Sequence, residues 1–532
     1  MLRTPAHNGH LMVAALKRHA NRPIVHLGDV TLTGKETADR ISRYIQAFES
    51  LGAGRGTPGA LLALNRPEVL FILGAGQTQG FQRTSLHPLG SADDHAYVIN
   101  DAGITILVID PSFAGRAAEL LEKCPRLTQV LTIGPVPDAL GEVSVSVTDL
   151  TEVAARFEPR PLTAAVLDPD HITSITYTGG TTGKPKGVIG TVRAFSTMAQ
   201  IQMAEWEWPA APRFLMCTPL SHAGAAFFVP VVLQGGTLFV SARFDPAEVL
   251  RTIEEQRIDS LMLVPSMLYA LMDHPDSRTR DLSSLETVYY GASAINPVRL
   301  REAIERFGPI FAQYYGQSEA PMVISYFPKG DHVDADGRPI ESRLTSCGRP
   351  SAYLRTALLD DAGNPVPPGE PGEICVAGPL LSAGYWQLPE VTAETFRGGW
   401  MHTGDVARED ENGYWYIVDR TKDMIVTGGF NVFPREVEDV IAEHPAIAQV
   451  GVIGTPHERF GEAVTAVVVL RDGWELSDDV VTEITSSVKE RKGSVQAPKE
   501  VIAVDALPLT ALGKPDKKAL RARFWTGERS VG

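Results

Sequence analysis

The sequence predicts an α/β protein with a large N-terminal domain of doubly wound α/β sheets, a small β-rich subdomain and a small α+β C-terminal domain. Strand-like and helix-like segments alternate over most of the chain, which is typical of parallel sheets covered by helices. A turn-dense segment near residue 360 precedes short strands, and a new series of elements begins near residue 421. At 532 residues, the chain is also too long for a single core.

The first alternating series begins with an amphipathic helix over residues 37–51, whose apolar side chains recur at helical spacing until Gly52 ends it. Residues 59–64 form an apolar run that is typical of a buried strand. A second helix is expected over residues 67–79 and a strand over residues 104–109. This order of elements favours a doubly wound sheet.

A second series follows in the middle of the chain. Strands are expected over residues 213–220 (running into a loop), 237–240, 260–265, 287–291 and 310–316. Asp245, Pro246 and Glu248 suit the N-cap, N1 and N3 positions of a helix that ends near Gln256. Ligands in open α/β sheets bind at the carboxyl ends of strands, so the loops after these strands are candidate binding segments.

Changes in composition indicate the domain boundaries. Gly, Pro and Asp are dense over residues 360–372, and short strands follow at 373–377 and 414–419. We therefore expect a β-rich subdomain over about residues 345–420, inside an N-terminal domain of residues 1–420. A C-terminal domain is expected over residues 421–532.

Composition excludes several classes of function. The net charge of −15 argues against a nucleic-acid-binding protein and against electrostatic anchoring to a membrane. The four cysteines are far apart and form no Cys-x-x-Cys pair, which favours free thiols in a reducing compartment. No apolar run has the length of a secretory signal or of a membrane span. We expect a cytoplasmic protein with no stable membrane insertion and no nucleic-acid partner.

The segment with the most marked chemistry is Tyr177 to Gly187, Tyr-Thr-Gly-Gly-Thr-Thr-Gly-Lys-Pro-Lys-Gly. Its four glycines allow backbone N–H groups to approach a phosphate, its three threonines supply hydroxyls, and its two lysines supply positive charge. The spacing differs from both the Walker A and the dinucleotide-binding motifs. A solvated turn between two strands is the structural alternative for such a loop considered alone.

This segment resembles the phosphate loop of the adenylate-forming superfamily, which contains acyl-CoA synthetases, peptide-synthetase adenylation domains and firefly luciferase. Residues 315–319, 400–405, 420–431 and 507–514 resemble further motifs of that family, in the same order along the chain. Bacterial fatty-acid–CoA ligases are the most similar members. The resemblance implies the adenylate-forming enzyme fold with a mobile C-terminal domain. It also implies ATP- and Mg²⁺-dependent activation of a carboxylic acid, expected to be a fatty acid, to an acyl-adenylate. Transfer to coenzyme A then gives an acyl-CoA, AMP and pyrophosphate.

The resemblance assigns the nucleotide site to residues from several loops. The expected phosphate-loop residues are Thr178, Gly179, Gly180, Thr181, Thr182, Gly183 and Lys186. Gly291, Ala292 and Ser293 are expected to flank one face of adenine, and Tyr315, followed by Gly316, to stack on the other. Asp405 is expected to accept hydrogen bonds from both ribose hydroxyls, with Arg420 as a second ribose contact.

The same resemblance assigns the reacting groups. Glu319 is expected to bind Mg²⁺, because a carboxylate suits a hard cation, and Ser318 stands where the family has a phosphate-binding threonine. Lys514 is the expected adenylation lysine, although Pro515 replaces the family's usual aliphatic residue. The hinge is expected at Lys422.

The remaining assignments concern coenzyme A and the acyl group. Gly428 and Gly429 are expected to line the tunnel for the pantetheine arm, where a side chain would obstruct the ligand. The expected acyl pocket consists of His222, Phe227, Val264, Met267 and Gly316, with His222 also expected to orient substrates. A structural histidine and ordinary core packing are the alternatives for these residues.

Three other functions stay open at this point. Gly316-Gln-Ser-Glu-Ala320 nearly matches the nucleophile elbow of α/β-hydrolases, but Ala320 replaces the last glycine. The acyl acceptor is either coenzyme A or a carrier protein, and the acid is either aliphatic or aromatic. A non-catalytic ATP-binding module would need neither Lys514 nor a hinge. The assembly is also open, with a homodimer as one alternative.

The resemblance predicts a division of labour between the two half-reactions. Lys514→Ala should abolish pyrophosphate release from ATP and the acid, because a cation is lost from the α-phosphate during adenylation. The variant should still convert added acyl-adenylate to thioester. Equal loss of both half-reactions, measured in single turnovers, would contradict the prediction.

Overall fold

The computed structural model describes residues 6–28, 30–178, 185–420, 423–427, 430–457, 460–509 and 515–525. It divides into two compact units. Unit 1 consists of Met1–Ala292, Ile310–Lys329 and Gly378–Phe396, and unit 2 of Ser293–Pro309, Gly330–Ala377 and Arg397–Gly532. Each unit is described by itself below. The expected boundary at residues 420–423 stays a prediction.

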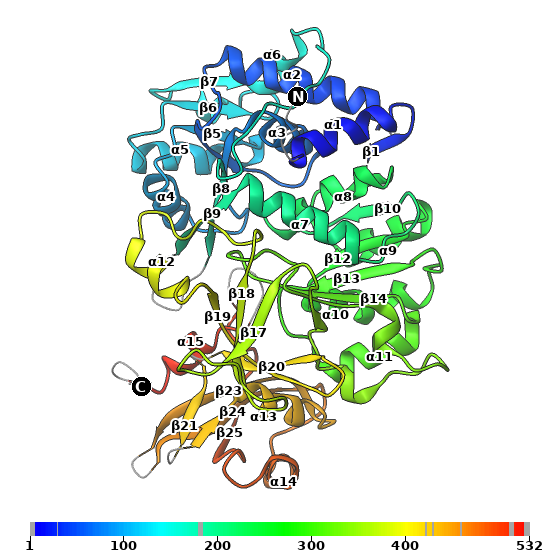
Figure 1. Cartoon of the computed structure of the whole chain (residues 1–532), viewed down its shortest axis with the longest axis vertical. Helices are drawn as coiled ribbons and strands as arrows, with labels where there is room; N and C mark the ends of the chain where they lie inside the picture. Colours follow the sequence, from blue (N-terminus) through cyan, green and yellow to red (C-terminus); the bar gives the residue numbers. More distant parts are fainter. Residues whose placement is uncertain are drawn as a thin grey trace. The chain divides into compact units, whose positions relative to one another are not determined.

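Unit 1 contains a seven-stranded sheet that is parallel except for its last pair. Its strand order is β7 (Ser146–Asp149), β6 (Gln129–Thr132), β5 (Ile106–Ile109), β3 (Pro58–Leu62), β4 (Gln82–Ser85), β8 (Ile172–Thr178) and β9 (Lys186–Thr191). Strands β8 and β9 form an antiparallel hairpin at one edge (Figure 1). The predicted strands near residues 60 and 106 lie side by side in this sheet.

The second sheet of unit 1 is also mainly parallel. Within the unit its order is β15 (Ser325–Phe327), β14 (Phe311–Tyr315), β13 (Thr287–Gly291), β12 (Ser260–Leu263), β10 (Arg213–Met216), β11 (Thr237–Val240), β1 (Pro23–Leu27) and β2 (Val30–Thr33). Only the outer pairs β14–β15 and β1–β2 are antiparallel. All five strands that were expected in this part of the sequence are present.

Helices cover these sheets. They are α1 (Asn8–Arg18), α2 (Gly34–Ser50), α3 (Pro67–Gln79), α4 (Ala92–Asp101), α5 (Ala114–Lys123), α6 (Leu150–Ala155), α7 (Val192–Glu205), α8 (Phe228–Leu233), α9 (Pro246–Glu255), α10 (Pro265–Asp273) and α12 (Pro389–Thr395). Helix α9 begins as predicted, because the Glu248 N–H donates to the Asp245 carboxylate at 3.0 Å. Helix α2 begins three residues earlier than expected, because Thr33 and Glu36 form a capping box.

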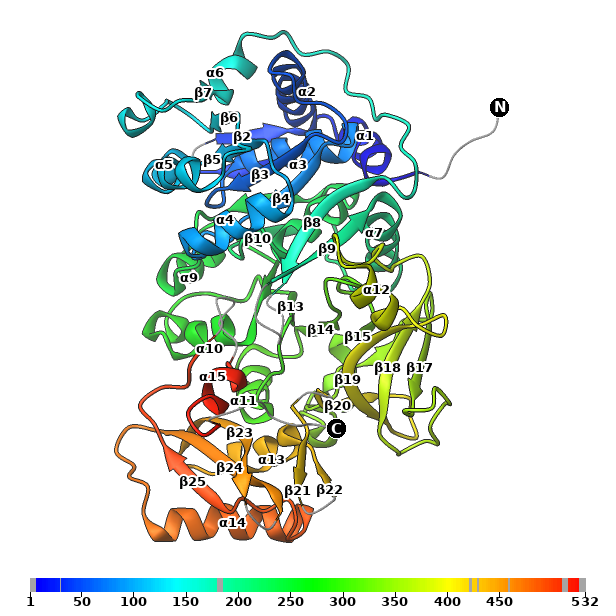
Figure 2. The ribbon, with the colours of Figure 1, turned by 90° about the vertical axis from the view of Figure 1, so that its left-hand side faces the viewer.

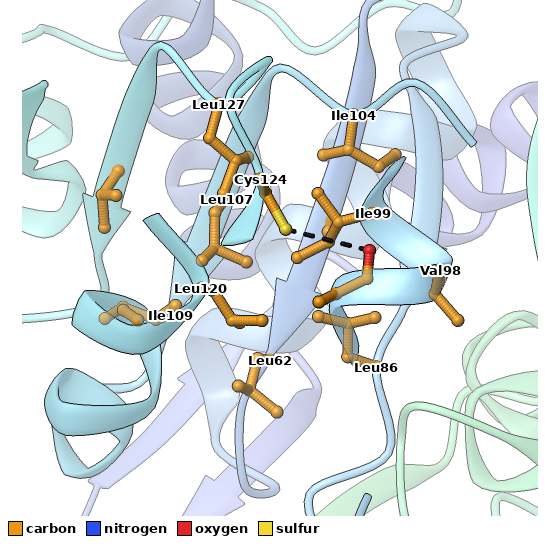
Figure 3. Packing of buried hydrophobic residues seen from close by; sticks show 14 of the residues in the cluster. Leu62, Leu86, Val98, Ile99, Ile104, Leu107, Ile109, Leu120, Cys124 and Leu127 are labelled. Carbon is orange, nitrogen blue, oxygen red and sulfur yellow. Dashed lines mark hydrogen bonds between the residues drawn. The ribbon is translucent and has the colours of Figure 1, made fainter. Parts of the chain in front are cut away.

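One core cluster of unit 1 packs α4 and α5 against the seven-stranded sheet. Figure 3 shows Leu62, Leu107 and Ile109 of the strands meeting Ile99 of α4 and Leu120 of α5. The Cys124 thiol, at the end of α5, lies in this apolar cluster and donates to the Ala96 carbonyl at 3.8 Å. All four cysteines are buried free thiols, as the sequence predicted.

Unit 2 contains the predicted small β-sheet. Its antiparallel order is β17 (Arg355–Leu359), β18 (Gly372–Ala377), β19 (Met401–Glu409) and β20 (Trp415–Arg420). Helix α11 (Pro297–Phe307) and the short strand β16 (Arg349–Pro350) also belong to this unit.

A second sheet of unit 2 is built from the C-terminal part of the chain. Its order is β22 (Phe430–Val432), β21 (Ile425–Thr427), β24 (Gly461–Leu470) and β23 (Ile447–His457), with β25 (Glu500–Ala503) parallel to β24. Helices α13 (Pro434–Ala442) and α14 (Asp478–Lys492) pack on one face, and α15 (Lys517–Arg521) packs on the other (Figure 2). Strand periodicity explains this: Val452 faces α13 and α14, whereas its neighbour Ile453 faces α15.

No helix of the described residues has both the length and the apolar character needed to cross a membrane.

Candidate active site

The phosphate-loop segment connects the two strands of the β8–β9 hairpin. Thr178 and Lys186 are cross-strand neighbours, as are Tyr177 and Gly187. Strand β8 ends at Thr178, and the second strand begins at Lys186. Residues 179–184, which include the expected sites Gly179, Gly180, Thr181, Thr182 and Gly183, lie outside the described residues.

Lys186 and Glu319 are connected through an aromatic side chain. The Lys186 ammonium lies 5.6 Å from the centroid of the Tyr385 ring. The Tyr385 hydroxyl donates a hydrogen bond of 2.7 Å to Glu319 Oε1. Burial and the negative charge of Glu319 both raise the pKa of the Tyr385 phenol, so it stays protonated and remains a donor. The structure thus brings together a candidate phosphate-binding cation and a candidate metal-binding carboxylate.

Backbone pairing positions Tyr385. The Trp386 N–H donates to the Gly187 carbonyl at 2.7 Å, and the Ile189 N–H donates to the Gly384 carbonyl at 2.9 Å, so this segment runs along β9. The Ser382 N–H donates to the Glu319 carbonyl at 2.8 Å. Sequence reasoning missed Tyr385, because no local motif connects it to a carboxylate 66 residues away.

The expected adenine-binding residues lie at the carboxyl ends of strands β13 and β14 and directly after them. A Cβ on Gly291 would lie 2.5 Å from the Tyr314 carbonyl oxygen, and one on Gly316 would lie 2.3 Å from the Met322 nitrogen. Both positions therefore require glycine for close backbone packing. For Gly316, the close Met322 backbone is one reason for a glycine. Its expected place in the acyl pocket stays a prediction. Ala292 has a left-handed φ of 64°, which marks a sharp turn directly after β13.

The loop that carries His222 is held by the side chain of Asn65. Asn65 is 6% exposed and lies just beyond β3. Its amide nitrogen donates to the Thr218 carbonyl at 2.9 Å, and its oxygen accepts from the Leu220 N–H at 2.8 Å. One amide thus satisfies a buried carbonyl and a buried N–H in the three residues before Ser221-His222. The sequence analysis did not select Asn65, since an isolated asparagine has no distinctive pattern.

His222 is held neutral by its surroundings. Burial, together with the nearby His87 and Arg83, lowers the pKa of His222 to about 4. Its ring lies edge to face with the His87 ring, with centroids 4.9 Å apart, and its Nδ1 is 2.9 Å from Ser221 Oγ. A neutral imidazole at pH 7 can donate one hydrogen bond and accept another.

The three other expected acyl-pocket residues have different environments. Phe227 is fully buried, with its ring centroid 4.8 Å from that of Phe214 and 5.7 Å from that of Trp206. This ring belongs to an aromatic core. Val264 and Met267 are partly exposed at the start of α10.

Asp405 and Arg420, which belong to unit 2, are cross-strand neighbours on β19 and β20. Asp405 is 4% exposed, and its backbone N–H donates to Thr403 Oγ1 at 3.1 Å. Gly404, with φ of 72°, lies between Thr403 and Asp405 within β19. Ser293 belongs to the same unit and precedes α11.

The carboxylate of Glu373 holds the part of β19 directly before Asp405. Its carboxylate accepts from the Gly404 N–H at 2.8 Å and contacts His402 Nδ1 at 2.6 Å. Cys375 Sγ lies 3.4 Å from the same nitrogen, so these three residues have the composition of a metal site. The hydrogen bonds between Glu373, His402 and Gly404 account for this cluster without a metal ion.

Several expected residues are not covered by this geometry. Lys422, Gly428, Gly429 and Lys514 lie outside the described residues, and their roles stay predictions.

Comparison with known proteins identifies the family. Residues 12–386 match the model of the AMP-binding enzyme family, and residues 436–514 match that of the AMP-binding enzyme C-terminal domain. The chain therefore belongs to the AMP-binding enzyme family, which confirms the resemblance inferred from its motifs.

Individual relatives match over the full chain. The chain is 68% identical to the medium/long-chain-fatty-acid–CoA ligase FadD8 of Mycobacterium tuberculosis, with 100% of this chain and 93% of the relative covered. It is 35% identical to a feruloyl-CoA synthase of Amycolatopsis sp, covering 96% and 97% of the two chains. The structure of amide bond synthetase McbA from Marinactinospora thermotolerans matches with a TM-score of 0.86 at 31% identity, covering 97% and 99%.

The Asn65 amide should be required for a correctly placed His222 loop. Asn65→Ala leaves the Thr218 carbonyl and the Leu220 N–H without partners, so we expect the free energy of unfolding to fall by about 1–3 kcal/mol. The catalytic efficiency with a carboxylic acid should fall as well. Asn100→Ala, which removes an exposed amide of unit 1, serves as the matched control. Equal stability and activity of the two variants would contradict this role.

The low pKa of His222 predicts a dependence of stability on pH. Between pH 6.5 and about 4, the unfolded state binds a proton at His222 that the folded state excludes. The stability that depends on a neutral His222 is therefore fully present above pH 6.5 and is lost as the pH falls toward 4. Between pH 6.5 and pH 5, the free energy of unfolding in urea should fall by roughly 1.5 kcal/mol more for the wild type than for His222→Gln. Parallel losses in the two proteins would show that His222 does not titrate abnormally.

Proposed function

We propose that this protein is a fatty-acid–CoA ligase that works through an acyl-adenylate. The observation that carries the proposal is the 68% identity to a medium/long-chain-fatty-acid–CoA ligase over the whole chain. The family membership supports ATP as the nucleotide, and coenzyme A is the proposed acceptor. The local geometry around Lys186, Tyr385 and Glu319 suits a polyphosphate with a divalent cation.

The first half-reaction joins a carboxylate to the α-phosphate of ATP. Two anions approach each other, so the site must supply positive charge and donors around the phosphorus. We assign this role to Lys186, Lys514 and the hydroxyls of Thr178, Thr181 and Thr182. The carboxylate oxygen forms the new bond to phosphorus, and pyrophosphate leaves.

A Mg²⁺ ion fits the described part of this site. Glu319 offers an oxygen ligand, and only its Oε1 accepts from Tyr385. A single carboxylate together with substrate phosphates is the usual way in which proteins hold Mg²⁺. The ion would neutralise phosphate charge, while Tyr385 fixes the orientation of the carboxylate.

The remaining nucleotide contacts are proposed from the same motifs. Tyr315 stacks on adenine next to the Gly291–Ala292 turn, and Asp405 accepts from the ribose hydroxyls, with Arg420 beside it. His222, held neutral, borders the acid and orients its carboxyl group by a hydrogen bond. Ser318 bonds phosphate through its hydroxyl.

The second half-reaction transfers the acyl group to the thiol of coenzyme A. We propose that the C-terminal domain, residues 421–532, rotates about Lys422 after adenylation. This would replace Lys514 at the site by the Gly428–Gly429 segment, beside which a thin pantetheine arm can pass. The thiol sulfur attacks the acyl carbon, and AMP leaves with the bridging oxygen.

A different acyl acceptor is the second candidate. The match to an amide bond synthetase supports it, since acyl transfer in that relative forms an amide. A carrier-protein thiol is a further acceptor and would give a thioester, as coenzyme A does. Aromatic acids are an alternative substrate class, supported by the feruloyl-CoA synthase relative. A cytoplasmic location and a homodimeric assembly are further proposals, the former supported by the buried free thiols.

Pyrophosphate release with ATP, Mg²⁺ and a panel of carboxylic acids tests the proposal. We expect a burst without coenzyme A, sustained turnover with coenzyme A, and an acyl-CoA product that is best with medium or long aliphatic acids. Pyrophosphate release without any thioester would favour another acceptor. The absence of release with every acid would contradict the ligase assignment.

A further inference from the structure

Arg83 of β4 is a cation without a counter-charge among the described residues. No hydrogen bond or ion pair is made by its guanidinium within the part of the chain that the structure describes. Burial lowers the pKa of this guanidinium to about 10, so it is still protonated at pH 7. A desolvated and unpaired charge is destabilising, and an apolar side chain of the same length would avoid that cost.

Two serine hydroxyls on the same face of the sheet also lack partners. Ser174 of β8 is the register neighbour of Arg83, and Ser85 is two residues farther along β4, so all three side chains project from one face. Among the described residues, neither Ser85 Oγ nor Ser174 Oγ makes a hydrogen bond, although both atoms are buried. Three groups that can donate hydrogen bonds therefore share a small area.

Strand β3 has a glycine, and therefore no side chain, beside Arg83. Gly59 of β3 is the register partner of Arg83 on the other side. A Cβ on Gly59 would meet only the backbone oxygens of Gln82 and Ile106, at 3.7 and 3.8 Å. No side chain of the described residues lies within 4 Å of that Cβ position, so there is room for one ligand atom directly beside Gly59.

Strand β4, which carries Arg83 and Ser85, continues toward the loop of His222, an expected acyl-pocket residue. His87 follows β4 and lies two residues beyond Ser85, with its ring in contact with His222. The Leu89 N–H donates to His87 Nδ1 at 3.1 Å, which leaves Nε2–H as the donor of a neutral ring. Arg83 is close enough to His222 to contribute to the field there. The series Arg83, Ser85, His87 and His222 thus presents donors from the sheet face to the residue that borders the acid.

We propose that Arg83, Ser85 and Ser174 form a subsite for an oxyanion carried by the acid, the second carboxylate of a dicarboxylic acid. The proposal rests on the acid-activating function above, and it deepens the substrate class. A carboxylate would provide a counter-charge for Arg83. Its two oxygens can accept hydrogen bonds from the guanidinium and from both serine hydroxyls. A free inorganic anion shares this chemistry, so the test has to separate the two sources.

Matched acids provide the kinetic test. The catalytic efficiency of the wild type is measured for α,ω-dicarboxylic acids and for monocarboxylic acids of equal length, in a series of increasing chain length. Arg83→Met should lower the ratio of the two efficiencies by roughly 10- to 100-fold, with little loss for the monocarboxylic acid. Arg83→Lys should retain part of the ratio. Arg55→Met, which removes an exposed arginine of the same unit, is the control and should leave the ratio unchanged.

Binding without ATP provides the second test. Calorimetry with the dicarboxylic acid, the monocarboxylic acid and inorganic phosphate is done on the wild type and on Arg83→Met. Loss of dicarboxylate binding alone supports the subsite. Loss of phosphate binding with an unchanged kinetic ratio would assign Arg83 to a free anion and overturn the proposal.

The outcomes separate this inference from the proposed function. If all variants convert the monocarboxylic acid and the ratio never changes, the subsite is wrong and the ligase assignment stands. If the wild type activates no acid, the ligase assignment fails, and calorimetry still decides whether Arg83 binds a carboxylate. Efficient use of monocarboxylic acids by Arg83→Met also excludes misfolding as the cause of a changed ratio.

Discussion

A single buried amide joins the two sheets of unit 1 where their strands end. Asn65 follows β3 of the seven-stranded sheet, and its side chain binds the loop that follows β10 of the other sheet. Its own N–H donates to the Ala242 carbonyl just beyond β11. Buried backbone groups need partners, and this loop has no strand to supply them. The amide therefore fixes the path of the segment that presents His222.

Two titratable side chains of unit 1, Tyr385 and His222, are held in their neutral forms by their surroundings. The phenol of Tyr385 stays protonated against Glu319, and the imidazole of His222 stays neutral against Arg83. Lys186 and Glu319 supply a cation and a carboxylate beside Tyr385. These two groups can bind a phosphate and a divalent cation, while the neutral phenol of Tyr385 orients the carboxylate.

The sequence predicted the fold class and the family, and the structure and comparisons confirm both. Periodicity and caps were sufficient for elements such as α9, because Asp245 and Pro246 act within one turn. The roles of Asn65 and Tyr385 could not be predicted in this way. Their partners lie 153 and 66 residues away, and such contacts exist only after the sheets form. Phe227 illustrates a different limit, because the sequence cannot distinguish an apolar residue that lines a pocket from one that packs in a core. The structure shows that Phe227 is fully buried.

The central claim is that the acid reacts with the α-phosphate of ATP to give an acyl-adenylate. A fatty acid with both carboxyl oxygens labelled with ¹⁸O tests it most directly in a turnover with ATP and coenzyme A. The account predicts one ¹⁸O in AMP and one in the thioester, because the bridging oxygen of the adenylate leaves with AMP. AMP without the label would contradict the acyl-adenylate and require a different chemistry for this protein.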